Sequence, residues 1–286
     1  MKKLFLLLAM AVITVVASAQ DKADTTYWAK GGNFSFNATQ VSLTNWAAGG
    51  QNNLSGVTKL QLFANYKKAN TSFDNKIDLG FGLSKVEGLA VQKNEDIIDL
   101  QSKLGIKASE KWFYSASLSF KSQFGPGYSD LTNTSKTSNF LSPANLTLAI
   151  GMDYKPNDML SVLISPLSGK MTIVNDKGID ATLYGLASAD AIIRMEMGAT
   201  VLAALKTDIA KNVGFSTELG LFSNYLDNPQ NVDVDWKVGI IMKINDYLSA
   251  QIDTRLIYDA DILDPVDNKA KVQFKELLGL GLNIKF

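Results

Sequence analysis

The sequence predicts an all-β fold, a transmembrane antiparallel up-and-down β-barrel of about 12 strands. Three observations predict it. Apolar and polar residues alternate in many segments, as expected for strands with one face toward lipid and the other toward a lumen. The links between these segments alternate between short and long. The last segment keeps its alternation up to a terminal Phe286.

The N-terminus has the features of a secretory signal peptide. Two lysines follow Met1, an apolar run covers 4–16, and Ala-Ser-Ala at 17–19 offers a cleavage site of small residues. The apolar run is too short for a membrane-spanning helix. We expect cleavage after Ala19, which gives a signal peptide over 1–19, a periplasmic segment over 20–30 and an outer-membrane β-barrel over 31–286.

Period-2 alternation defines the expected strands. At 231–245, apolar Val, Trp, Ile and Met residues alternate with Asp and Lys, so the two sets face opposite sides of an extended strand. Two segments carry the pattern less fully: 31–44 has few large aliphatic residues, and 158–165 is short and ends at Pro166. The expected strands are 31–44, 54–66, 71–84, 96–108, 111–124, 139–154, 158–165, 191–207, 212–226, 231–245, 246–259 and 270–286.

The connections support an even number of strands with both termini in the periplasm, because outer-membrane barrels have short periplasmic turns and longer extracellular loops. The short links are 67–70, 109–110, 155–157, 210–211 and 245–246; the longer ones are 45–53, 85–95, 125–138, 166–190, 227–230 and 260–269. The longest, 166–190, contains the apolar stretches 171–174 and 182–186, which we expect to fold back into the lumen or to extend a hairpin outside.

Composition excludes much chemistry. The chain has no Cys and no His, which removes thiolate nucleophiles, Cys-bound zinc and the commonest general base. Its 28 basic and 28 acidic residues become 26 and 28 after loss of the two lysines of the signal peptide, a net charge of −2 that argues against a nucleic-acid partner. We therefore expect no enzymatic activity and no cofactor, although a Ser–Lys pair remains open.

The polar faces of the strands carry charges of both signs. One interpretation is a solvated lumen whose charges pair across neighbouring strands; the other is a pore whose lining selects solutes. The first is favoured, because neither sign dominates and a barrel of ~12 strands can be largely filled by its side chains and loops. The candidate lumen-lining residues are Lys59, Asp78, Lys103, Lys121, Arg194, Glu196, Glu218, Lys237, Asp253 and Arg255.

Acidic residues also gather in or beside expected extracellular loops, at Glu95 and Asp96, at 227–235 and at 259–267. Calcium takes oxygen ligands, but this spacing matches no calcium loop, so solvated loops are favoured over a metal site. Aromatic residues stand where membrane-interface girdles would lie, at Trp112, Tyr114, Tyr154, Tyr225, Tyr247 and Tyr258.

The N-terminal segment 27–53 carries a resemblance. Its Tyr27-Trp28, the Gly pair at 31–32 and the run NWAAGG at 45–50 resemble an uncharacterised family of Bacteroidetes outer-membrane proteins, a domain of unknown function. The resemblance implies an envelope location and no activity. It singles out Trp46, Gly49 and Gly50, which we interpret as a tight turn with an aromatic anchor; the alternative is a plug or ligand contact.

The leading functional hypothesis is a passive channel or uptake barrel for small solutes in the bacterial outer membrane. The alternative is a structural barrel with a blocked lumen, whose extracellular loops dock a partner. The expected partners are the lipid bilayer, lipopolysaccharide and the outer-membrane assembly machinery, which would recognise the C-terminal strand ending at Phe286. No feature of the sequence names a solute or a protein partner.

Overall fold

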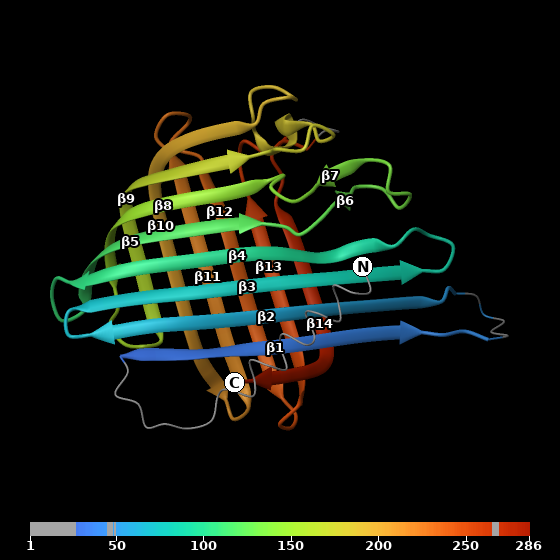
Figure 1. The fold of residues 1–286 in the computed structure, drawn as a ribbon, viewed down its shortest axis with the longest axis horizontal. Helices are drawn as coiled ribbons and strands as arrows, with labels where there is room; N and C mark the ends of the chain where they lie inside the picture. The colour runs from blue at the N-terminus through green and yellow to red at the C-terminus, as the bar shows by residue number, and fades with distance from the viewer. Residues whose placement is uncertain (1–26, 45–47, 49, 265–268) are drawn as a thin grey trace.

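The computed structural model describes residues 27–44, 48, 50–264 and 269–286. In this part of the chain twelve strands close into an antiparallel barrel in which each strand pairs with its neighbours in the order of the chain (Figure 1), which confirms the predicted fold class. The strands are β1 (Trp28–Val41), β2 (Asn53–Lys68), β3 (Thr71–Val86), β4 (Gln92–Lys107), β5 (Trp112–Ser122), β8 (Ala144–Tyr154), β9 (Leu160–Ile173), β10 (Ile193–Ala210), β11 (Val213–Asn224), β12 (Val232–Lys243), β13 (Leu248–Tyr258) and β14 (Gln273–Lys285).

Two short elements lie outside the barrel sheet. β6 (Gly127–Tyr128) and β7 (Lys136–Ser138) form a small hairpin, and η1 (Ala181–Tyr184) is a 3-10 helix in the link before β10. The predicted signal peptide lies outside the described residues. The first strand begins at Trp28 rather than at 31, so the end of the segment expected to be periplasmic already pairs with β2.

The prediction of a short strand ending before Pro166 is wrong. β9 continues through Pro166 to Ile173, so the expected loop 166–190 is in fact a loop over 174–192. The register of β9 shifts against β8 between Ile150 and Met152, and against β10 between Gly198 and Thr200. These irregularities leave Pro166 outside both ladders, where its missing N–H breaks no hydrogen bond. Residues 171–173, which were expected to leave the wall, belong to it.

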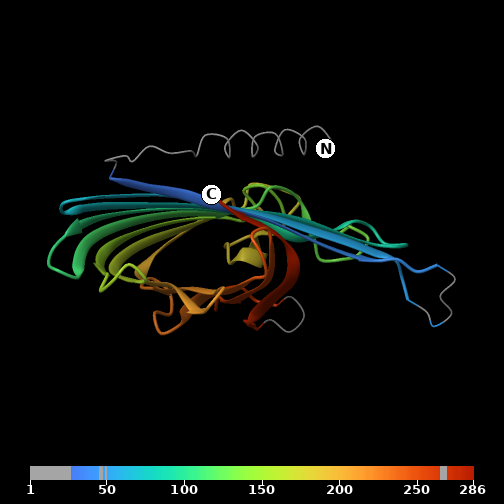
Figure 2. The ribbon, with the colours of Figure 1, turned by 90° about the horizontal axis from the view of Figure 1, so that it is seen from below.

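The two ends of the barrel differ. At one end, here called the turn end, the links are 69–70, 108–111, 155–159, 211–212 and 244–247; at the other, the loop end, they are 42–52, 87–91, 123–143, 174–192, 225–231 and 259–272. The predicted alternation of short and long links is therefore present. At the loop end the β1–β2 and β3–β4 hairpins project beyond the rest of the barrel (Figures 1 and 2).

The molecule is apolar outside and polar inside. The side chains of Leu118, Leu148, Ile164, Trp236 and Leu280 are all more than 40% exposed on the outer face, whereas the buried residues include more polar than hydrophobic ones. A soluble protein rarely exposes a continuous apolar surface of this kind. The outer face therefore suits hydrocarbon.

Polar groups on this outer face are satisfied locally. Asn75 Nδ2 donates to the carbonyl of Ala64 at 3.0 Å, and Ser102 Oγ donates to Asn75 Oδ1 at 2.7 Å. Trp236 Nε1 donates to Thr217 Oγ1 at 2.9 Å. Because an unsatisfied polar group is costly in hydrocarbon, these internal bonds let the wall carry polar residues without breaking its apolar character.

Aromatic side chains gather at the turn end. Trp112 and Tyr154 lie 4.9 Å apart between ring centroids, and Trp28 lies 5.2 Å from Tyr66 and 6.5 Å from Phe73. Of the other expected girdle residues, Tyr114 and Tyr247 are exposed at this end, and Tyr225 and Tyr258 lie at the loop end. The aromatic band at the turn end is therefore dense, and the one at the loop end is sparse.

The irregularity in β9 requires a glycine opposite it. A Cβ on Gly151 would overlap the carbonyl oxygen of Ile164 and lie 2.6 Å from Ser165 Cα. Gly151→Ala should therefore destabilise the barrel by about 1–3 kcal/mol, as overpacking does. The measurement is the urea midpoint at which the refolded protein loses its heat-modifiable gel shift.

Gly169→Ala is the matched control in the same wall, because its added Cβ would meet nothing closer than the Glu196 carbonyl oxygen at 4.0 Å. Equal midpoints for the two variants would contradict the assignment of Gly151 to the bulge.

Candidate functional site

The lumen holds a cavity of about 3340 Å³. Its lining begins at Tyr27 and Trp28 at the turn end and extends to Tyr184 and Asp259 at the loop end. The cavity therefore runs along the barrel axis, and charged side chains cross it.

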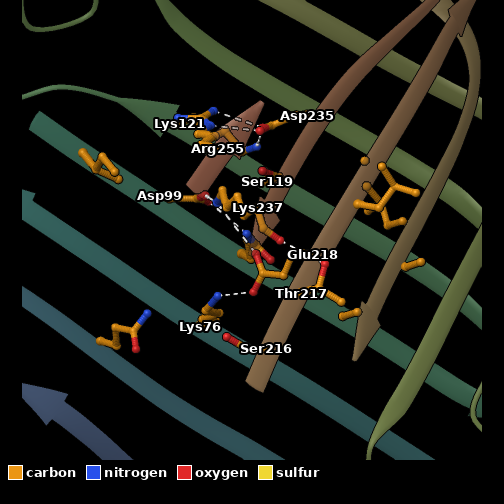
Figure 3. Close-up of a pocket in the computed structure, with 18 of the residues that line it drawn as sticks. Lys76, Asp99, Ser119, Lys121, Ser216, Thr217, Glu218, Asp235, Lys237 and Arg255 are labelled. Carbon is orange, nitrogen blue, oxygen red and sulfur yellow. Dashed lines mark hydrogen bonds and ion pairs between the residues drawn. The ribbon is translucent and has the colours of Figure 1, made fainter. Parts of the chain in front are cut away.

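A central charge network crosses the middle of the lumen (Figure 3). We use this name for Lys76, Asp78, Asp99, Lys121, Glu218, Asp235, Lys237 and Arg255. Lys237 Nζ on β12 lies 2.7 Å from Asp99 Oδ2 on β4, and Lys76 on β3 pairs with Glu218 on β11. Around the ring of twelve strands, β4 is opposite β12 and β3 is opposite β11. These ion pairs therefore join opposite walls of the barrel. Figures 1 and 2 show that the barrel is flattened, so that these two walls lie close together.

A second part of this network fixes Asp235. Its carboxylate accepts hydrogen bonds from Arg255 Nε at 2.9 Å and Nη2 at 3.0 Å, and from Lys121 Nζ on β5 at 2.7 Å. The two-pronged contact of a guanidinium with a carboxylate fixes geometry as well as charge. With four basic and four acidic members, the central charge network has no net charge, so it braces the walls without imposing a field of one sign.

Two further networks are also balanced. The seam network, on the side where the first and last strands meet, consists of Lys59, Glu95, Asp253 and Lys275, with Lys59 Nζ 2.6 Å from Asp253 Oδ2 and Lys275 Nζ 2.7 Å from Glu95 Oε1. The turn-end network consists of Asp74, Lys103, Asp153 and Lys155, with Lys103 Nζ and Lys155 Nζ each 2.6 Å from a carboxylate, of Asp153 and Asp74 respectively.

The fourth group, the loop-end network, carries excess negative charge. Lys170 Nζ lies 2.8 Å from Asp233 and 3.3 Å from Asp259, while Arg194 contacts Asp261 and, at 3.2 Å, Glu196. Two cations thus face four carboxylates at the mouth of the cavity.

The ten sequence-predicted lumen residues all occur in these networks. Seven line the cavity: Lys103, Lys121, Arg194, Glu196, Glu218, Lys237 and Arg255. Lys59, Asp78 and Asp253 face inward but are held in ion pairs beside it. The expected pairing between neighbouring strands describes only part of the arrangement, because the central pairs connect opposite walls.

The placement of Glu95 in a loop is wrong, because it lies in β4 and is 3% exposed. Asp233 and Asp235 lie in β12, within the expected strand 231–245. β4 starts at Gln92, within the expected link 85–95, because its first residues still pair with β3. In the described part of the chain no group of three or more acidic side chains could hold a metal ion.

Sequence reasoning missed the wall of small hydroxyl side chains. Ser117 and Ser119 of β5, Thr147 of β8 and Thr200 of β10 line the cavity together with Gly220 of β11. This hydroxyl wall lies on the side of the central charge network away from β1 and β14. The alternation of Ser at 115, 117 and 119 was the available signal, since every second residue of a strand faces one side.

The loop 174–192 folds over the cavity on a small core of its own, formed by Val174, Ile179, Ala181 and Leu186. The Tyr184 hydroxyl donates to the Thr137 carbonyl at 2.6 Å, and burial raises the pKa of Tyr184 to about 12. Gly178, Asp180 and Leu183 line the cavity. The loop thus covers part of the loop-end mouth, and in Figure 2 its short helix lies between the two walls.

Trp46 and Gly49 of the N-terminal motif lie outside the described residues. Gly50 has φ +125°, and a Cβ there would lie 2.8 Å from Leu43 Cδ1, so the backbone favours glycine at this position. The role of the motif stays a prediction. No helix in the described part of the chain is long and apolar enough to span a membrane.

Comparison with known proteins gives one family match. A family model described as "Protein of unknown function (DUF3078)" matches residues 38–128, from the end of β1 through β6. The match is to an uncharacterised family, as the resemblance implied, and covers about a third of the chain. No match is found among curated protein sequences.

Several solved outer-membrane barrels show a general likeness. An outer membrane channel from Pseudomonas putida F1 is 15% identical, with a TM-score of 0.41 over 93% of this chain and 100% of that chain. The translocator domain of the autotransporter NalP from Neisseria meningitidis is 9% identical, with a TM-score of 0.37 over 98% and 95%. Outer membrane phospholipase A from Escherichia coli is 11% identical, with a TM-score of 0.37 over 93% and 94%. Likeness at this level says nothing of activity.

Removing one member of the central charge network should be costly. Lys237→Met leaves Asp99, whose side chain is 2% exposed, without its cation, and we expect a loss of about 3 kcal/mol. Urea unfolding of the refolded barrel measures it. Adding Asp99→Leu should recover part of the loss.

The matched control for that variant is Lys67→Met. Lys67 and Asp158 form an exposed pair at 3.5 Å, so the loss should stay below about 1 kcal/mol. A Lys67 variant as unstable as the Lys237 variant would contradict a bracing role for the central charge network.

Acid should release the loop 174–192. The hydrogen bond from Lys136 Nζ to Asp176, with those from Asn139 and the Gly178 amide, lowers the pKa of Asp176 from 3.8 to about 2. Because the folded-state pKa is lowered, the stabilisation is present above about pH 4 and is lost as the pH falls through about 2. A spin label at Lys177→Cys should become more mobile over that range.

Asp176→Asn should make the same label mobile at pH 7, since it removes the charge. An Asn variant with an immobile label at pH 7 would show that other contacts hold the loop.

Proposed function

We propose that this protein is a passive channel of the bacterial outer membrane for small hydrophilic solutes. The observation that carries the proposal is the axial cavity of about 3340 Å³, lined by charged and hydroxyl side chains, inside a barrel whose outer face is apolar. A polar lumen within an apolar shell is the arrangement of a water-filled pore in lipid.

The proposed location rests on three features. The outer face is apolar, aromatic residues form a band at the turn end, and the N-terminal sequence resembles a secretory signal peptide. Short links at one end and long ones at the other support a periplasmic turn end and an external loop end. The alternating strand that ends at Phe286 supports recognition by the assembly machinery.

The middle of the lumen favours uncharged solutes of small size. The central charge network is balanced and its members are occupied with one another, so it offers neither cations nor anions a free partner of opposite charge. The hydroxyl wall beside it offers hydrogen bonds from Ser119 and Thr147. A narrow passage between these two surfaces suits a neutral, hydrogen-bonding solute.

A second function is favoured by one specific observation: the loop 174–192 folds over the mouth and the central ion pairs join opposite walls. Both narrow the lumen. A barrel closed in this way would be a scaffold whose loops dock a partner.

Catalysis is not part of the proposal. Lys103 Nζ donates to Ser161 Oγ at 2.6 Å, the kind of pair that a Ser–Lys hydrolase would need. However, Lys103 Nζ is also 2.6 Å from the fully buried carboxylate of Asp153, and Ser161 Oγ donates to that carboxylate at 2.8 Å. Both members of the Ser–Lys pair are therefore engaged by Asp153, which supports a structural role for them.

Planar-bilayer recordings test the channel. The wild-type barrel should give discrete conductance steps, and Lys76→Ala with Glu218→Ala should increase the step size, because the double variant removes one cross-lumen pair without changing the net charge. We expect the conductance step to increase about twofold, because the constriction is wider.

The control is Lys67→Ala with Asp158→Ala, an exposed pair at the turn-end rim that should leave the step size unchanged. If neither the wild-type barrel nor the widened one conducts, the channel proposal fails and the scaffold remains.

A further inference from the structure

The barrel wall is joined least where its first and last strands meet. β1 and β14 pair only over Asn33–Asn37 and 281–285. By contrast, β14 pairs with β13 from Gln273 to Leu282, and β1 pairs with β2 over its whole length. In the described part of the chain, no strand pairs with the β1-facing edge of β14 from Gln273 to Gly279.

The hydrogen bonds show which backbone groups are left over. Gly32 and Phe286 exchange backbone bonds at 2.7 and 3.1 Å, so the even-numbered residues of β14 direct their N–H and C=O groups at β1. Phe274, Glu276 and Leu278 thus present both groups to a gap. Their side chains face outward, where Phe274 is 63% and Leu278 71% exposed.

Two glycines of β14 lie at the last level where this strand contacts β1. A Cβ on Gly281 would overlap the Phe36 carbonyl oxygen, and one on Gly279 would lie 2.9 Å from Asn37 Cγ. The two strands are therefore pressed together at this level. Toward the loop end they separate, and Figure 1 shows β14 bending as it reaches β1.

The seam network bridges the gap from inside. Lys275 on β14 reaches Glu95 on β4, and Asp253 on β13 reaches Lys59 on β2, which also lies 3.6 Å from Glu95. The pairs Lys275–Glu95 and Asp253–Lys59 span the β1–β14 junction. Although Lys275 points inward, its side chain is 46% exposed. Toward the turn end a hydrogen-bonded ladder holds the junction, and toward the loop end ion pairs do.

Hydrocarbon does not tolerate such an edge. Unpaired backbone groups are costly in lipid, and they persist only where they line a wet cavity or contact a polar group. The gap combines apolar side chains that face lipid, unpaired backbone donors and acceptors, and an accessible ammonium group behind them. This combination is amphipathic.

We propose that the gap between β1 and β14 is a lateral opening through which a single-chain amphipathic molecule moves between the lumen and the bilayer. Its apolar tail lies along Phe274 and Leu278, and its polar head takes hydrogen bonds from the unpaired edge and from Lys275. The inference rests on the proposed membrane location and not on ion conduction.

Cysteine pairs test the geometry, because the chain has no Cys of its own. Phe36→Cys with Leu282→Cys, which are paired neighbours, should cross-link on oxidation. Gln40→Cys with Leu278→Cys occupies the positions that would be neighbours if the ladder continued, and it should remain at least tenfold less cross-linked. Efficient cross-linking of both pairs would show a closed junction and overturn the proposal.

Fluorescence quenching tests the ligand. A bimane label at Leu277→Cys, inside the gap, should be quenched by a fatty acid spin-labelled on its chain at least twice as strongly as a label at Ser119→Cys on the far wall. Glu95→Gln, which weakens the seam network, should increase the difference. Equal quenching at the two positions overturns the proposal.

The heat-modifiable gel shift of each labelled variant establishes folding in liposomes. A barrel that is folded in lipid, quenched at 277 and silent in bilayer recordings supports the lateral opening while rejecting the channel, so the two failures are distinguishable. A soluble peptide with the β1 sequence provides a further test. If adding it abolishes quenching at 277, the edge binds a protein strand, and the proposal is overturned.

Discussion

The rest of the structure depends on one constraint: most of the charges that the strands direct into the lumen must find partners of opposite sign there. The outer face is given to apolar side chains, and period-2 alternation sends the polar set inward. Around the lumen this produces four networks, three of them with equal numbers of acids and bases. The central charge network is the decisive one, because Lys237–Asp99 and Lys76–Glu218 connect opposite strands and so determine the flattened cross-section.

The side chains that line the lumen differ in size from one side to the other. Long side chains occupy the middle and the seam side, whereas the hydroxyl wall carries Ser119, Thr147 and Thr200, which leave space. A passage along that wall follows from the difference in side-chain size rather than from any vacancy in the fold. The loop 174–192 adds a second restriction at the mouth, held by its own apolar core and by the contacts of Asp176 and Tyr184.

Alternation and link length were sufficient to predict twelve strands, their order and their inward charges, because both signals are local. Partners across the lumen were not predictable, since Lys237 and Asp99 are separated by 138 residues and no local pattern relates them. Pro166 misled the strand prediction for the opposite reason: a local rule excludes proline from a regular ladder, but the wall bulges there and lets β9 continue. Glu95 was also placed wrongly. Two adjacent acidic residues are typical of a loop, and the lysines that pair with Glu95 could not be seen in the local sequence.

The pairing of inward charges also closes part of the junction of β1 and β14. A barrel is usually closed by backbone hydrogen bonds, which do not depend on the identity of the side chains. Here the backbone ladder ends at Gly281, and ion pairs between side chains continue the closure. A polar headgroup can take the place of one partner of an ion pair, whereas it cannot take the place of a strand in a ladder. A wall that is closed by Lys275 and Glu95 is therefore closed in a way that an amphipathic molecule can compete with, and the unpaired edge of Phe274, Glu276 and Leu278 is where that competition would occur.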